Sequence, residues 1–128
     1  MNKKNYTSLA RKSADIQINE LKKVKKVFNN SFNKAVDLIL KCKGKVIFAG
    51  IGKSGLVARK ISATFSSVGI PSFFCDPAQA LHGDMGQIEK KDILIIFSYS
   101  GNTIELNNML KNLLSVYKGN FIILHLSL

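Results

Sequence analysis

The sequence predicts an α/β domain, a three-layer αβα sandwich built on a parallel sheet and preceded by amphipathic helices. Three observations predict it. Short apolar runs of strand length recur from residue 45 onward, helical periodicity separates them, and turns rich in glycine or serine follow two of them. Strands that alternate with helices form βαβ units, whose sheets carry helices on both faces. Ligands of such sheets bind outside the carboxyl ends of the strands, so function is expected in the turns there.

Positive charge is concentrated in the first third of the chain. The net charge is +11, and residues 1–45 hold 12 lysines and arginines against 3 acidic residues. Such a segment suggests nucleic-acid binding. A solvated, lysine-rich helix face is the preferred interpretation, because the lysines flank an apolar helical stripe and lack interleaved aromatic residues. We therefore expect no nucleic-acid partner.

That stripe predicts one or two amphipathic helices over residues 5–42, broken around Asn29–Ser31 and ended by Gly44. Its apolar members are Leu21, Val24, Phe28, Phe32, Ala35 and Ile39. Residues 1–42 are expected to form a helical segment that packs on a domain spanning residues 43–128.

The rest of the chain is expected to alternate between strands and helices. Strands are predicted over residues 45–49, 72–75, 93–97 and 121–124, and helices over residues 54–68 and 102–117, with a turn or helical piece at 77–81. In the first of these helices, Val57, Ile61, Phe65 and Val68 are expected on one side.

Cysteine usage and hydropathy indicate the compartment. Cys42 and Cys75 belong to no C-x-x-C motif and lie near no histidine cluster, so neither a zinc site nor a redox motif is expected. Apolar runs fall well short of the roughly 20 residues that cross a bilayer. We expect a cytoplasmic protein with no membrane partner, no metal and no cofactor.

The first candidate site is the turn Gly50-Ile51-Gly52-Lys53-Ser54-Gly55, a G-x-G-x-x-G between a strand and a helix. A P-loop is excluded because Ile47 stands where that motif needs glycine. A dinucleotide site remains open, since Asp76 lies roughly 20 positions on, although Asp76 is expected to cap the segment after the second strand. A smaller phosphorylated ligand, bound through Gly52 and Ser54 with Lys53 as a fixed positive charge, is a third interpretation. A tight turn without a ligand is the fourth.

The second candidate site, Ser98–Glu105, follows an apolar strand and opens a helix at the same sheet edge. Ser98, Ser100 and Thr103 can present hydroxyls beside free backbone N–H groups, and Gly101 lets a ligand approach. This arrangement with Asn102 suits a phosphate monoester. The alternative is a capping box of Asn102 and Glu105, which leaves the serines unexplained. Two phosphate-competent turns exceed what a dinucleotide fold requires, so a phosphorylated small molecule is favoured.

These residues resemble the sugar isomerase (SIS) domain. The resemblance rests on the two turns, on Pro71-Ser72-Phe73-Phe74 and on Ala80-Leu81-His82-Gly83-Asp84-Met85-Gly86. Within that family the chain is similar to the D-arabinose 5-phosphate isomerases, which interconvert ribulose 5-phosphate and arabinose 5-phosphate for Kdo and capsule synthesis. The resemblance implies a flavodoxin-like sheet, a pentose phosphate substrate and a homo-oligomer with shared active sites.

Aldose–ketose isomerisation requires a base, a proton donor and a phosphate anchor. The resemblance assigns Lys53, His82 and Glu105 to catalysis: Lys53 would offset enediolate charge, His82 would open the sugar ring or shuttle a proton, and Glu105 would act as base or orient a hydroxyl. A structural role for His82 and a helix-capping role for Glu105 are the alternatives.

Family members continue past the fourth strand into another strand, further helices and usually a pair of CBS repeats. Residues 43–128 are therefore expected to form a partial SIS domain that lacks the last strand and has no CBS repeats. A non-catalytic module that binds a sugar phosphate is the alternative function.

Overall fold

The computed structural model describes residues 5–116 and 119–125. The chain divides into two compact units, Met1–Val36 and Asp37–Leu128. No helix in the described part of the chain combines the length and the apolar character that a bilayer crossing requires.

The first unit consists of helix α1 (Tyr6–Val24), the 3₁₀ turn η1 (Lys25–Val27) and the start of helix α2 (Asn30–Leu40). The predicted break between two helices is confirmed, and it begins at Phe28, which leaves helical geometry. Asn29 causes the restart, because its side-chain oxygen accepts hydrogen bonds from the N–H groups of Ser31 (2.9 Å) and Phe32 (3.3 Å). The Phe28 and Phe32 rings pack edge to face, with their centroids 5.0 Å apart.

The predicted helix end at Gly44 is wrong. Helix α2 ends at Leu40, two residues before the predicted bound at residue 42, so Gly44 is not at its end. Gly44 is required by space rather than by capping, because a Cβ atom there would overlap Oδ1 of Asp92. The Asp92 side chain is fully buried and accepts the N–H groups of Lys45 and Glu89, each at 2.8 Å.

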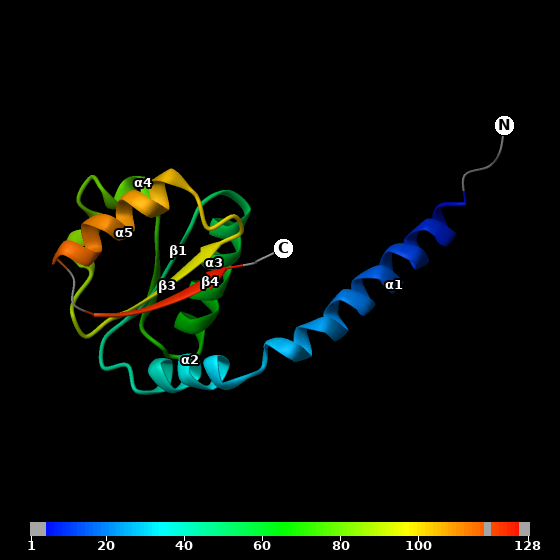
Figure 1. The fold of residues 1–128 in the computed structure, drawn as a ribbon, viewed down its shortest axis with the longest axis horizontal. Helices are drawn as coiled ribbons and strands as arrows, with labels where there is room; N and C mark the ends of the chain where they lie inside the picture. The colour runs from blue at the N-terminus through cyan, green and yellow to red at the C-terminus, as the bar shows by residue number, and fades with distance from the viewer. Residues whose placement is uncertain (1–4, 117–118, 126–128) are drawn as a thin grey trace. The chain divides into compact units, whose positions relative to one another are not determined.

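The described residues of the second unit include a parallel sheet of four strands in the order β2-β1-β3-β4. Figure 1 labels β1, β3 and β4 among the helices of this unit. The strands are β1 (Val46–Gly50), β2 (Ser72–Cys75), β3 (Ile93–Ser98) and β4 (Asn120–His125). The prediction of a flavodoxin-like parallel sheet is confirmed, and the strand ends agree within one residue.

Helices cover both faces of this sheet, as predicted. Alternate side chains of the central strands point to opposite faces. Val46 and Phe48 face α3 (Gly52–Ser67) and the last turn of α2, whereas Ile47 and Ala49 face α4 (Pro77–Ala80) and α5 (Ile104–Val116). The 3₁₀ turn η2 (Asp84–Gln87) follows α4. Tyr117, the predicted last residue of α5, lies outside the described residues.

The predicted buried face of α3 is partly wrong. Val57 and Val68 are 51% and 67% exposed, while Gly55, Ala58 and Ser62 are buried. Close packing of the helix start on β1 explains the rotation, because a Cβ atom at Gly55 would lie 2.6 Å from the carbonyl oxygen of Gly50. The helix therefore turns its small residues, rather than its valines, toward the sheet.

Candidate functional site

The two turns that the sequence singles out face each other across neighbouring strands. Strands β1 and β3 pair in parallel, and Gly50 lies beside Phe97 in the register. The chain leaves β1 toward β2 on one side and returns to β3 on the other side. The carboxyl ends of β1 and β3 therefore form the point where the strand order reverses, which is where ligands bind in open α/β sheets.

Glycines give the first turn its shape. Gly52 begins α3 with a φ of +58°, a left-handed conformation that disfavours side chains. Gly50 and Gly55 instead allow close contact, since a Cβ atom at Gly50 would lie 3.0 Å from the Gly55 nitrogen. The turn thus brings the amino end of α3, with Lys53 and Ser54, directly beside the end of β1.

The second turn is ordered by its own serines. The Ser98 hydroxyl oxygen accepts the Gly101 N–H at 2.9 Å, and the Ser100 hydroxyl oxygen accepts the Asn102 N–H at 3.2 Å. These two N–H groups are therefore not free, contrary to the prediction for the turn. The serine O–H groups remain available as donors, and Gly101 has a φ of +67°.

Helix α5 begins at Ile104, two residues later than predicted. The Thr103 carbonyl accepts the Asn107 N–H at 2.9 Å, so Thr103 holds the N-cap position in place of Asn102. The capping-box interpretation is therefore wrong. The first N–H groups of α5 have no partner within the helix, and they add partial positive charge at this edge.

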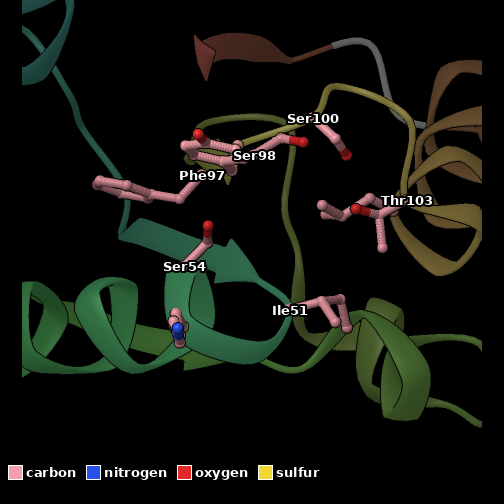
Figure 2. Close-up of a pocket in the computed structure, with 9 residues that line it drawn as sticks. Ile51, Ser54, Phe97, Ser98, Ser100 and Thr103 are labelled. Atoms are coloured by element: carbon pink, nitrogen blue, oxygen red, sulfur yellow. The ribbon is translucent and has the colours of Figure 1, made fainter. Parts of the chain in front are cut away.

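A cavity of about 430 Å³ lies between the two turns (Figure 2). The hydroxyl groups of Ser54, Ser98, Ser100 and Thr103 lie around it, and Lys53 also lines it. Five of the predicted site residues are thus brought together from two separate segments of the chain. The first turn contributes a cation and a hydroxyl, and the second contributes three hydroxyls.

The other predicted site residues do not line this cavity. His82 is exposed in the turn after α4, where its backbone N–H donates to the Gln79 carbonyl at 2.8 Å. Glu105 is exposed in the first turn of α5. Gly52, Gly101 and Asn102 are exposed parts of the two turns. Four of the five lie in the turns and helix starts that follow β1 and β3, whereas His82 lies in the turn after α4, and the roles of all five stay predictions.

Asp76 does what was expected of it. Its carboxylate caps α4 by accepting the Ala78 N–H at 3.0 Å. Among the described residues, His, Cys, Asp and Glu side chains nowhere gather in groups of three or more that could hold a metal ion.

Sequence reasoning missed the apolar part of the cavity wall. Ile51, Phe97, Tyr99 and Leu106 line it together with the polar residues. Each of the four is next to a predicted site residue or to a glycine of the first turn in the sequence. That position was the one feature from which the sequence could have predicted them as part of the cavity wall. Tyr99 is 59% exposed, so the cavity has a partly exposed aromatic residue in its wall.

The fold and the site define a doubly wound α/β domain with an anion-suited cavity at its switch point. Comparison with known proteins identifies the family to which this domain belongs. The family model for the SIS domain matches residues 39–125, and the chain belongs to that family.

The chain resembles several proteins named as sugar-phosphate isomerases. It is 42% identical, over 85% of its length, to a probable arabinose 5-phosphate isomerase of Haemophilus influenzae, of which it covers 32%. The chain therefore spans about a third of the length of the curated relatives it matches. A protein of Escherichia coli CFT073, solved in complex with arabinose 5-phosphate, is 38% identical with a TM-score of 0.80, covering 99% of this chain and 67% of that one. A putative sugar-phosphate isomerase of Listeria monocytogenes is 30% identical with a TM-score of 0.88, covering 98% and 65%.

Proposed function

We propose that this chain binds a sugar phosphate and isomerises it between aldose and ketose, with ribulose 5-phosphate and arabinose 5-phosphate as its substrate pair. One observation carries the proposal. Hydroxyl groups from two separate turns surround a single cavity at the switch point. The relative solved with arabinose 5-phosphate supports the choice of sugar.

The phosphate is held by the second turn. Ser98, Ser100 and Thr103 donate O–H hydrogen bonds, and the amino end of α5 supplies the favourable dipole. Because Ser98 and Ser100 already accept backbone N–H groups, their oxygens are fixed and their protons point to other acceptors. Ser54 adds a donor from the first turn, and Gly52, Gly101 and Asn102 shape the approach.

The sugar carbons lie toward the first turn, where proton transfer takes place. Isomerisation removes a proton from the carbon next to the carbonyl, and protonation of the carbonyl oxygen then gives an enediol. A proton added to the former carbonyl carbon, with loss of the proton from the other enediol oxygen, completes the exchange. Lys53 stabilises the negative charge that develops on the enediolate oxygen. Glu105 is the candidate base or hydroxyl-orienting group, and His82 is the candidate for ring opening. Neither His82 nor Glu105 lines the cavity, so both act from its rim, the exposed loops around its mouth. Substrate binding must therefore bring these loops closer to the sugar.

The wider role follows from the substrate. Arabinose 5-phosphate is a precursor of Kdo, so the proposal places the protein in the cytoplasmic supply of sugars for lipopolysaccharide or capsule. A homo-oligomer would complete the rim with residues of a second copy.

A binding-only module is the second candidate, and a specific observation favours it. Of the three side chains assigned to catalysis, Lys53 lines the cavity, whereas His82 and Glu105 are exposed and do not. The same cavity would then sense or carry a sugar phosphate without turning it over.

Turnover of ribulose 5-phosphate by the 128-residue chain separates the two. The isomerase proposal predicts conversion to arabinose 5-phosphate, reduced about 100-fold in kcat by Lys53→Met. Lys60→Met is the matched control, because Lys60 is exposed on the same helix and does not line the cavity. Calorimetric binding of arabinose 5-phosphate without turnover would reject the isomerase and support the module. Neither binding nor turnover would reject both.

A further inference from the structure

A second hollow lies at the opposite edge of the sheet. It measures about 220 Å³ and adjoins the amino ends of β3 and β4, at Ile93 and Asn120. Four lysines line it: Lys41, Lys43, Lys90 and Lys91. They come from two segments, the connection between α2 and β1 and the residues just before β3. The fold, rather than a run of lysines in the sequence, therefore gathers this charge.

The acidic groups beside the hollow are already engaged. Glu89 pairs with Lys45 and Lys91, both at 3.0 Å, and Asp92 lies 3.4 Å from the Lys45 ammonium. The hydrogen bond from Lys45 lowers the pKa of Glu89, which keeps that carboxylate charged. Within the described residues Lys41, Lys43 and Lys90 form no ion pair. Three exposed lysine side chains without an ion pair therefore line one small concavity.

Like charges brought together by a fold repel one another, and an anion between them removes that repulsion. The hollow is too small for a drug-sized ligand, since such sites measure about 300 Å³ or more. It has room for roughly seven water molecules at about 30 Å³ each, which suits a compact anion. Several ammonium groups on one anion favour a ligand with more than one charged phosphoryl group.

We propose that the hollow lined by Lys41, Lys43, Lys90 and Lys91 binds a chain of phosphoryl groups, as found in inorganic polyphosphates and in nucleoside polyphosphates. This site is separate from the sugar-phosphate cavity and does not depend on the proposed function. The two lie at opposite ends of the same strands β1 and β3, so the anion would not compete directly with a sugar phosphate.

A neighbouring cavity predicts different affinities for inorganic polyphosphates and for nucleoside polyphosphates. Lys90 also lines a cavity of about 400 Å³, whose walls include the apolar side chains of Met85, Ile88, Leu113 and Val116. A nucleoside attached to the phosphate chain can place its base there. ATP should therefore bind more tightly than inorganic tripolyphosphate if the physiological ligand is a nucleotide, and no more tightly if it is an inorganic polyphosphate.

Calorimetric titration of the full chain with tripolyphosphate tests the proposal. Saturable binding is expected at low ionic strength and should weaken as salt is added. Lys43→Gln and Lys90→Gln should each weaken it about tenfold, the loss expected for one hydrogen bond to a charged group. Lys60→Gln and Lys111→Gln remove exposed lysines outside the hollow, and they should leave the affinity within about twofold.

Three results would overturn the proposal. The first is an absence of saturable binding by a chain whose circular dichroism shows it folded. The second is an equal loss in the control variants, which would mean attraction to the overall charge. The third is a loss in Ser54→Ala and Thr103→Val but not in the lysine variants, which would assign tripolyphosphate to the sugar-phosphate cavity.

Discussion

At the scale of single residues, glycines determine how closely the first turn packs. Gly50 and Gly55 touch backbone to backbone, and that contact rotates α3 until Ala58 and Ser62 face the sheet. The same rotation directs Ser54 toward the end of β3 (Figure 2). A hydroxyl of the proposed site thus owes its position to the absence of two methyl groups.

Gly55→Ala should destabilise the fold by about 2 kcal/mol, because its methyl group must push against the Gly50 carbonyl. Chemical denaturation measures the effect. Gly86→Ala is the matched control, since a Cβ atom there meets nothing within 4 Å and the residue has no positive φ. That variant should stay within about 1 kcal/mol of the wild type or be slightly more stable. Equal losses would contradict the packing argument.

Cys75 should behave as an inert thiol. It is 2% exposed, and burial, assisted by the nearby carboxylates of Asp84 and Asp76, raises its pKa from 9.0 to about 11. Because the folded pKa lies above the unfolded value, this group favours folding below pH 9 and loses that contribution between about pH 9 and 11, by roughly 3 kcal/mol at most. At pH 8 a thiol reagent should label the half-buried Cys42 well before Cys75. Equal labelling rates in the folded protein would contradict this.

At the scale of elements, strands were easier to predict than helix faces. The apolar run at residues 93–97 has strand length, and β3 occupies it with one further residue. Apolar periodicity predicted the wrong buried face for α3, because a periodic pattern is read from large apolar residues. The residues of α3 that contact the sheet include the small Gly55 and Ala58. Gly44 was misread because its role depends on Asp92, a residue that is distant in sequence.

The amino ends of β1 and β3 depend on Asp92. Its buried carboxylate accepts two backbone N–H groups, those of Lys45 and Glu89. Asp92→Asn removes the charge and places an NH₂ group against one of these donors, so we expect a loss of about 3 kcal/mol in thermal or chemical unfolding. Asp37→Asn is the control, since Asp37 is exposed on α2, and it should change stability by less than about 0.5 kcal/mol. Similar losses in the two variants would contradict a special role for Asp92.

At the scale of the whole molecule, topology converts two separate motifs into one site. The motifs at residues 50–55 and 98–105 could be recognised in the sequence, and a parallel sheet requires their strands to end at the same edge. The apolar wall and the hydrogen bonds inside the second turn could not be recognised there. They depend on side-chain packing and on the left-handed backbone geometry of Gly52 and Gly101 in the two turns.

The central claim is that both turns bind one phosphoryl group, and calorimetric affinity for arabinose 5-phosphate tests it most directly. Ser54→Ala and Thr103→Val each remove one hydroxyl that makes no hydrogen bond within the described residues, so they alter ligand contacts with little effect on the fold. Each should weaken binding about tenfold, while Ser115→Ala, far along α5, should leave it unchanged. Unchanged affinity in either cavity variant would contradict the claim.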